Sequence, residues 1–237
     1  MSGTLYAIGV GPGDPDLLTL KAVRLIQSGA LIAYPVGDDS DASFARTIAA
    51  VHLPKGAEEY GFRVPMRVAR GPASEAYDNA ARRLTTHLSA GRDVALLCEG
   101  DPFFYGSAMY LVERLAPSHP CEIVPGVTSL TACAAAIKRP LAARNERLKV
   151  LPAPLAADVL MRELREAEAA AIIKVGRHFE KIRAVLDETG LAGRAMIIER
   201  ATGAEERITK LSDVPEGERP YFSTILVYRG AEPWGQS

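Results

Sequence analysis

The stretch LYAIGVGPGD, residues 5–14, joins an apolar run to a glycine-rich turn and a helix-capping aspartate. Residues 5–10 predict a buried strand, and Asp14 followed by Pro15 predicts the start of a helix. A buried strand that runs through a glycine turn into a helix is typical of an α/β fold. Apolar runs and amphipathic stretches alternate along the rest of the chain, so we expect an α/β protein throughout.

The pattern beyond residue 14 predicts the remaining elements. The helix after Asp14 has an apolar face of Leu17, Leu20, Val23 and Ile26, and Gly29 ends it. We expect Pro35 to end the next strand, at 31–34. Further helices are predicted at 43–53, 74–90, 107–116, 128–137, 157–167 and 179–189. Further strands are predicted at 62–68, 93–98, 122–124, 148–151, 171–175, 195–199, 207–210 and 222–228. We expect the last two to be antiparallel edge partners.

A change of composition divides the chain. Residues 138–149 are rich in Arg, Lys and Asn and show little periodicity, which is typical of a linker. We therefore expect an N-terminal α/β domain at 1–144 with a mostly parallel sheet. A C-terminal α/β domain with a mixed sheet is expected at 145–237.

Composition narrows the class of protein. The 237 residues are 48% hydrophobic, and 28 Lys and Arg against 29 Asp and Glu leave a net charge of −1. This balance argues against a nucleic-acid binder. No apolar run reaches the roughly 18 residues that a membrane-spanning helix needs, and the N-terminus lacks a basic segment before an apolar core. We expect a cytoplasmic protein without a membrane partner. The cysteines and histidines have no metal-ligand spacing, so no metal site is expected.

The glycine loop at 9–14 does not predict a nicotinamide cofactor. Its glycines follow the pattern GxGxG, whereas the dinucleotide fingerprint is GxGxxG. Pro12 has no N–H to offer a phosphate, and Asp14 places a negative charge where a pyrophosphate would bind. The chain has no GxxxxGK[ST] motif. Taken alone, this loop is a tight strand-to-helix turn.

Two later loops also follow predicted strands. Residues 98–107, CEGDPFFYGS, hold two carboxylates, two glycines and three aromatic rings. Residues 124–130, VPGVTSL, lead into a helix of small side chains that allows close backbone approach. Ligands bind at the carboxyl ends of parallel strands, so both loops are candidate site loops. Each has a purely structural alternative: a capped turn over core aromatics in the first, and close helix–sheet packing in the second.

Three ordered motifs carry a resemblance to a known family. VGPGDPDLLTLKA at 10–22, CEGDPFFYGS at 98–107 and VPGVTSLTACAA at 124–135 resemble the tetrapyrrole (class III) methyltransferases. AIIKVGRHFEKI at 171–182 and MIIERAT at 196–202 also fit, so the resemblance covers essentially the whole chain. It implies two α/β domains with the active site in the cleft between them, and S-adenosylmethionine as methyl donor. It also implies a homodimer.

Within this family the chain is most similar to the branch that methylates C20 of precorrin-2 to precorrin-3A in cobalamin biosynthesis. The supporting features are YPV at 34–36, KVGRH at 174–178, YFSTILV at 221–227 and the forms of the second and third motifs. The alternatives are the cobalt-containing form of the same acceptor and a tetrapyrrole carrier without catalysis. Diphthamide intermediates, ribosomal RNA and uroporphyrinogen are other acceptors of this fold. They are disfavoured by the motif match and, for RNA, by the balanced charge.

The resemblance also implies roles for individual residues. The donor site would comprise Pro12, Glu99, Gly100, Asp101, Phe104, Thr128, Ser129, Val175, Ala201 and Thr224. Candidates to assist proton removal are Glu99, Asp101 and Tyr105. The polycarboxylate acceptor would be held by residues near the first loop and by arginines: Gly11, Pro12, Gly13, Asp14, Arg63, Arg67, Arg144 and Arg177. Arg70 and Arg139 are further candidates, although most exposed arginines are solvated surface.

Overall fold

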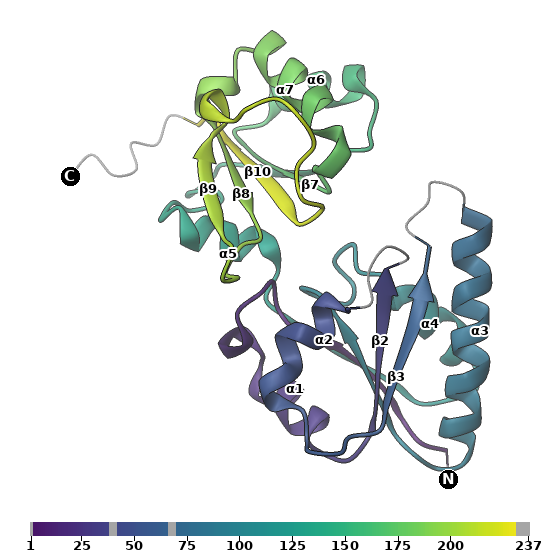
Figure 1. Cartoon of the computed structure of the whole chain (residues 1–237). Helices are drawn as coiled ribbons and strands as arrows, with labels where there is room; N and C mark the ends of the chain where they lie inside the picture. Colours follow the sequence, from purple (N-terminus) through teal and green to yellow (C-terminus); the bar gives the residue numbers. More distant parts are fainter. Residues whose placement is uncertain (1, 38–41, 66–69, 231–237) are drawn as a thin grey trace. The chain divides into compact units, whose positions relative to one another are not determined.

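The computed structural model describes residues 2–37, 42–65 and 70–230. By their internal contacts, these residues divide into two compact units, 1–128 and 129–237. Each unit contains its own β-sheet with helices packed against it, which confirms the expected α/β class with two α/β units (Figure 1).

The first unit contains a five-stranded parallel sheet. Its strands are β1 (Leu5–Gly9), β2 (Leu31–Gly37), β3 (Glu59–Val64), β4 (Val94–Cys98) and β5 (Cys121–Val124). The order across the sheet is β3-β2-β4-β1-β5, and every pairing is parallel. All five carboxyl ends therefore share one edge. The loops after β1, β4 and β5, which carry the three motifs, follow three neighbouring strands at that edge.

Helices cover both faces of this sheet. They are α1 (Leu20–Ile26), α2 (Phe44–Ala49), α3 (Arg70–Ser89) and α4 (Ala108–Leu115). Side chains alternate along β4: Leu96 and Cys98 pack in the cluster beneath α3 and α4, whereas Ala95 and Leu97 pack in the cluster beneath α1 and α2. Both faces of the strand are thus buried, as expected for a central strand of a parallel sheet.

Two local predictions in the first unit were wrong. Pro35 does not end β2, which runs on to Gly37. β2 pairs with β4 only as far as Ala33, so at Pro35 the strand has one neighbour, β3. Proline has no N–H to donate, and on the side of β4 no hydrogen bond is lost there. The helix after Asp14 is also interrupted, because a 3-10 turn at Pro15–Leu17 ends before Thr19 caps α1. This break leaves Leu20 82% exposed, away from the apolar face predicted for it.

The second unit contains a mixed sheet. Its strands are β6 (Leu148–Pro152), β7 (Ala169–Ile173), β8 (Ala195–Glu199), β9 (Arg207–Lys210) and β10 (Ser223–Tyr228), in the order β6-β7-β10-β8-β9. β10 is antiparallel to both β7 and β8. The prediction that β9 and β10 pair at an edge was wrong, because β10 is the central strand and β9, an edge strand, pairs with β8.

Helices also cover both faces of the second sheet. α6 (Ala157–Glu166) and α7 (Phe179–Glu188) supply the core on one face, with Leu160 and Phe179 fully buried. On the other face, α5 (Ser129–Ala136) packs against β10, and the Cys133 thiol hydrogen-bonds the Thr224 hydroxyl. Burial raises the pKa of this thiol to about 12, so Cys133 packs as a small neutral side chain, as expected. Because α5 packs on this sheet, the contacts group it with the second unit. The boundary expected at 144/145 stays a prediction.

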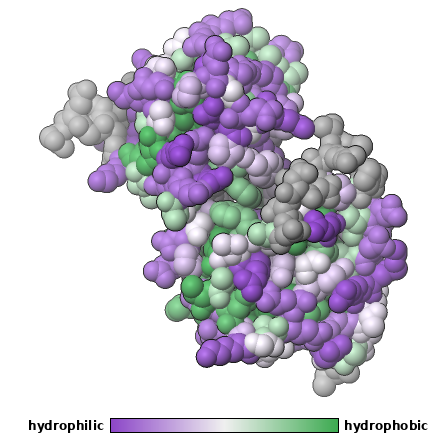
Figure 2. Space-filling view, in the orientation of Figure 1, coloured by the Kyte–Doolittle hydropathy of each residue, from purple (hydrophilic) through white to green (hydrophobic). Residues whose placement is uncertain are grey.

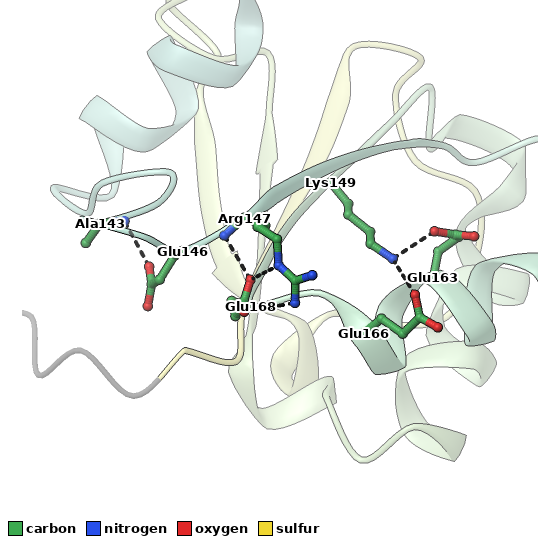
Figure 3. Close-up of polar contacts among 7 residues, drawn as sticks. All are labelled: Ala143, Glu146, Arg147, Lys149, Glu163, Glu166 and Glu168. Carbon is green, nitrogen blue, oxygen red and sulfur yellow. Dashed lines mark hydrogen bonds and ion pairs between the residues drawn. The ribbon is translucent and has the colours of Figure 1, made fainter.

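The segment expected to be a linker is tied to the second sheet by polar contacts (Figure 3). Arg147 donates from Nε and Nη2 to the two carboxylate oxygens of Glu168 at 3.0 Å each, and its backbone N–H adds a third bond at 2.8 Å. Lys149 Nζ lies between Glu163 and Glu166, at 2.8 and 3.2 Å. These contacts fix residues 147–149 against α6 and β7, so this stretch is part of the folded unit.

The two units differ in surface character on the face drawn in Figure 2. Mostly hydrophilic side chains cover the second unit, whereas paler and hydrophobic side chains are interspersed among hydrophilic ones over the first. None of the helices in the described residues combines the length and apolarity needed to cross a membrane.

Candidate active site

The three motif loops of the first unit meet through the backbones of their glycines. Gly100 donates its N–H to the Gly11 carbonyl at 2.8 Å, and Gly11 donates to the Gly100 carbonyl at 3.3 Å. A Cβ on Gly9 would lie 2.6 Å from the Gly100 carbonyl oxygen, and one on Gly126 would lie 2.1 Å from the same atom. No side chain fits at either position. The glycines therefore allow the loops after β1, β4 and β5 to form one continuous backbone junction.

Asp101 follows Gly100 of this junction directly in the chain. Its Oδ1 accepts the N–H groups of Phe103 and Phe104 at 2.9 and 3.0 Å, and its Oδ2 accepts the N–H of Gly126 at 3.0 Å. The first two bonds close the turn that follows β4. The third links this turn to the loop after β5. Both oxygens of the side chain are thus engaged by backbone amides.

Glu99 lies in a different environment. Burial raises the pKa of its carboxyl group, although the backbone N–H groups of Glu99 itself and of Ala45 hydrogen-bond to it and oppose the shift. Ala45 lies at the start of α2, and Arg46 on the same helix donates two 3.0 Å hydrogen bonds to Glu59 of β3. Arg46 and Glu59 therefore hold α2 in the place where its N-terminus meets Glu99.

The aromatic residues of the second motif are only partly buried. Phe103 is 54% exposed and Tyr105 is 42% exposed, whereas Phe104 is half-buried and packs edge-on against Tyr105. Tyr105 has a φ of 56°, which a non-glycine residue seldom adopts. The alternative that all three rings belong to the core is wrong for Phe103 and Tyr105. This loop presents aromatic surface at the edge where the motifs meet.

The chemistry of this edge suits a cation better than an anion. Gly11 and Pro12 are buried, and Asp14 caps the following 3-10 turn by accepting the Asp16 N–H at 2.9 Å. Pro12 offers no N–H, and Asp14, Glu99 and Asp101 bring carboxyl groups to the loops. These carboxyl groups would repel a pyrophosphate, whereas they would attract a positively charged sulfonium.

Three further predicted donor residues share one edge of the second sheet. Because β10 is antiparallel to both β7 and β8, the carboxyl ends of those strands lie beside the start of β10. Val175 follows β7, Ala201 follows β8, and Thr224 is the second residue of β10. All three are buried, with at most 5% of each residue exposed. The fold thus brings together residues that lie 49 positions apart in the chain (224 minus 175).

Sharp turns precede two of these residues. Lys174 and Arg200 follow the last residues of β7 and β8 with φ values of 58° and 50°, so each strand ends in a left-handed turn. Beyond the second turn, Thr202 donates its N–H to Glu206 at 2.6 Å, which closes the loop around Ala201. Residues held in this uncommon conformation are often found at binding sites.

The arginines predicted to bind the acceptor are spread over both units. Arg63 is exposed on β3 of the first unit. Arg144 and Arg177 are exposed in the second unit, and Arg177 lies in a 3-10 turn (Gly176–His178) beside Val175. Arg139 has a structural role, since its guanidinium stacks 3.8 Å from the centre of the Tyr228 ring. Arg67 lies outside the described residues.

The sequence motifs did not single out every residue that builds the edge. Thr128 and Ser129 lie two and three residues beyond Gly126, and their place in the donor site stays a prediction. Gly9, in the glycine loop, and Gly126, in the third motif, are not among the predicted site residues, although their close approach forms the junction. Ala45 was missed because only its backbone N–H contributes. The sequence feature that could have identified these glycines is their position at or just after the end of a predicted strand.

Comparison with known proteins identifies the family to which a chain with these two units belongs. The profile of the Tetrapyrrole (Corrin/Porphyrin) Methylases matches residues 4–215. The chain therefore belongs to the tetrapyrrole methylase family, as the three motifs predicted.

Individual relatives refine the comparison. The chain is 41% identical over 236 residues to the cobalamin biosynthesis protein CobIJ of Mycobacterium tuberculosis, covering 96% of this chain and 46% of CobIJ. It thus spans about half the length of that relative. It is 36% identical to a precorrin-2 C(20)-methyltransferase of a Sinorhizobium species, covering 95% of each chain. It is 32% identical to the cobalt-precorrin-2 C(20)-methyltransferase of Salmonella typhimurium, covering 96% and 97%.

A solved structure supports the fold in detail. The uroporphyrin-III C-methyl transferase of Thermus thermophilus, complexed with S-adenyl homocysteine, matches with a TM-score of 0.69 and 26% identity. The match covers 95% of this chain and 92% of that one.

Proposed function

We propose that this protein transfers a methyl group from S-adenosylmethionine to C20 of precorrin-2, giving precorrin-3A in cobalamin biosynthesis. The observation that carries the proposal is the end-to-end similarity to a precorrin-2 C(20)-methyltransferase, over 95% of both chains. The geometry supports it independently. The three motifs of the resemblance meet at one sheet edge, with closely packed glycines and carboxyl groups suited to a cationic donor.

The donor supplies a methyl group on a positively charged sulfur when it is bound. We propose donor-binding residues in the three motif loops and, within the second unit, at the ends of its strands. The donor-binding residues are Pro12, Glu99, Gly100, Asp101, Phe104, Thr128, Ser129, Val175, Ala201 and Thr224. The main contribution of the protein is positioning, because a methyl group and an acceptor carbon held in line at close distance react much faster than free reactants.

The acceptor is a flat ring with many carboxylates. Arginine suits such groups because its planar guanidinium binds a carboxylate through two parallel hydrogen bonds. We propose Arg63, Arg67, Arg144 and Arg177 for this role, with Gly11, Pro12, Gly13 and Asp14 lining the ring. The aromatic surface of Phe103 and Tyr105 lies on the same sheet edge as the first loop and offers a stacking face for the macrocycle.

A proton must leave the macrocycle after methylation. Glu99 is the better placed of the candidate carboxyl groups, because burial raises its pKa and so brings it closer to the working pH. Tyr105 remains a second proposal. Removal of this proton by water or by the substrate itself is the alternative.

The acceptor could carry cobalt, as it does in the name of the Salmonella relative. We propose the metal-free form, because none of the three motifs contains a histidine that could act as an axial ligand. The higher identity to the Sinorhizobium enzyme, 36% against 32%, supports the same choice.

Parallel turnover assays test the proposal. The protein is incubated with methyl-labelled donor and either precorrin-2 or its cobalt form, and label in the macrocycle is measured. We expect faster transfer to precorrin-2. Faster transfer to the cobalt form would reassign the acceptor, and binding of both ligands without transfer would indicate a carrier. Transfer to uroporphyrinogen alone would move the chain to another branch of the family.

We further propose that the protein is a cytoplasmic homodimer. Exposed apolar side chains of the first unit, Leu20 at 82% and Val51 at 74%, are consistent with a subunit contact. Sedimentation equilibrium tests this state directly, since a homodimer would have twice the 25.4 kDa chain mass. A monomer at micromolar concentration would contradict it.

A further inference from the structure

We infer that Asp101 is a positioning residue, which holds the loop after β5 against the loop after β4, and is not the proton acceptor of the reaction. The inference rests on the proposed donor site at this edge. It changes the role that the sequence motif suggested for Asp101, because both oxygens of the carboxylate are already used by the backbone.

The hydrogen bonds of Asp101 divide between two loops. Oδ1 accepts from Phe103 and Phe104 within its own turn, whereas Oδ2 accepts from Gly126 across the junction. An ionised carboxylate only accepts hydrogen bonds, and all three partners are backbone N–H groups, which only donate. The three bonds occupy most of the lone pairs of this carboxylate. The ionised form gives the strongest bond between the two loops, because a proton on Oδ2 would weaken that oxygen as an acceptor for the Gly126 N–H.

The glycine junction explains why this bond matters. Gly9, Gly100 and Gly126 pack backbone against backbone and have no side chains with which to hold one another. Asp101 supplies a charge-assisted bond between the β4 and β5 loops, and such bonds are stronger than neutral ones. Thr128 lies two residues beyond Gly126, and Glu99 lies two residues before Asp101. Loss of the bond would therefore displace proposed donor contacts on both sides.

The same sheet contains a matched control. At the amino ends of the strands, Asp93 accepts the Thr4 N–H at 2.7 Å, so it also links two neighbouring strands, β4 and β1, through a backbone amide. Asp93 precedes β4, whereas Asp101 follows it. Asp93→Asn replaces a carboxylate at the opposite end of the same strand without touching the motif loops.

The test compares Asp101→Asn, Asp101→Ala and Asp93→Asn in the full chain. Asparagine keeps one oxygen for Phe103 and Phe104 but turns an NH2 group toward Gly126. Three quantities are measured: the Kd of S-adenosylhomocysteine by calorimetry, the pH profile of methyl transfer, and hydrogen exchange of the 124–128 backbone. Asp101→Asn should weaken binding about tenfold or more, as expected for a lost hydrogen bond to a charged group. Its pH profile should keep the wild-type shape, and exchange at Gly126 should accelerate. Asp93→Asn should leave all three unchanged.

Several results would overturn the inference. One is an Asp101→Asn variant with wild-type affinity for S-adenosylhomocysteine whose rate falls and whose acidic limb is lost, since that is the behaviour of a missing base. Equal weakening by Asp93→Asn would show a general loss of stability instead. Unchanged affinity, rate and exchange would exclude any role. If the wild-type chain itself does not bind S-adenosylhomocysteine, the proposed function fails, while exchange at Gly126 still tests whether Asp101 holds the loop.

Discussion

Gly9 and Gly126 approach so closely that a Cβ on Gly9 would lie 2.7 Å from the Cα of Gly126. Real Cβ atoms do not come this close to another backbone atom, so neither residue can be exchanged without moving a strand end. The two residues are 117 positions apart in the chain (126 minus 9); Gly9 is the last residue of β1, and Gly126 lies two residues beyond β5. Their contact brings the first and third motifs together.

Substitution of Gly126 by alanine should therefore destabilise the protein. The new Cβ would lie 2.1 Å from the Gly100 carbonyl oxygen, and overpacking against backbone lowers the free energy of unfolding by about 1–3 kcal/mol. Urea unfolding followed by circular dichroism measures the change. Gly37→Ala is the control, because Gly37 ends the parallel strand β2 and a Cβ there meets nothing within 4 Å. Equal stability of the two variants would contradict the tight junction.

Glu99→Gln should raise thermal stability at neutral pH. Burial raises the pKa of Glu99 above its ordinary value of 4.5, so the charged form is disfavoured in the folded state. This carboxyl therefore reduces stability progressively as the pH rises from about 4.5 through the raised pKa. Differential scanning calorimetry at several pH values should show a gain in Tm at pH 7 that shrinks toward pH 4. A Tm difference independent of pH would show that Glu99 titrates normally.

Glu168 should have the opposite pH dependence. The hydrogen bonds from Arg147 lower the pKa of this carboxyl to about 2. Its stabilising effect is therefore complete above its ordinary pKa of 4.5 and is lost as the pH falls toward about 2. Wild type should be more stable than Glu168→Gln at pH 6, and the two should converge at pH 2. Because the pair is at the surface, 1 M salt should reduce the difference. Persistence of the full difference at pH 2 would argue against ionisation of Glu168 as its cause.

Tyr228 offers a substitution that should be tolerated. Its ring is buried under Arg139, and its hydroxyl has no hydrogen-bond partner among the described residues. Burial raises the pKa of this hydroxyl to about 12, so it stays neutral. Tyr228→Phe removes a buried polar group without partners and should leave stability unchanged or raise it by up to about 1 kcal/mol. A loss of more than about 1 kcal/mol on chemical unfolding would reveal a hydrogen bond to the hydroxyl.

Arg139→Ala should destabilise the same site by about 0.5–2 kcal/mol, the range for a cation above an aromatic ring. Arg139→Lys should recover only part of this, because lysine lacks the flat face that stacks on Tyr228. Thermal unfolding of the three proteins measures the order. An alanine variant as stable as wild type would show that the stacking contributes nothing.

The predictions from sequence succeeded where local pattern decides the outcome. Strand-end glycines and apolar runs predicted an α/β chain, and the parallel-sheet rule correctly predicted that the β4 and β5 loops would share an edge. Leu20 was misplaced because a second cap, Thr19, restarts the helix and rotates its faces. The spacing of apolar residues alone does not reveal that the predicted helix is interrupted in this way.

Other features depend on partners that lie far away in the chain. Pro35 remains within β2 because β4 has already stopped pairing at that point, and the register of two separate strands decides this. β10 enters the centre of its sheet, between strands that precede it by more than 20 residues. Likewise, one of the three hydrogen bonds of Asp101 comes from Gly126, which no local motif connects to it. Sequence could predict that these residues matter, but their roles follow from the long-range contacts.

The position of the transferred methyl group tests the central claim most directly. The protein is given precorrin-2 and S-adenosylmethionine labelled with ¹³C in the methyl group, and the product is examined by ¹³C NMR. We predict one new labelled methyl group per macrocycle, attached at C20. A label at any other ring carbon, or no label when donor and acceptor are both saturating, would contradict the account.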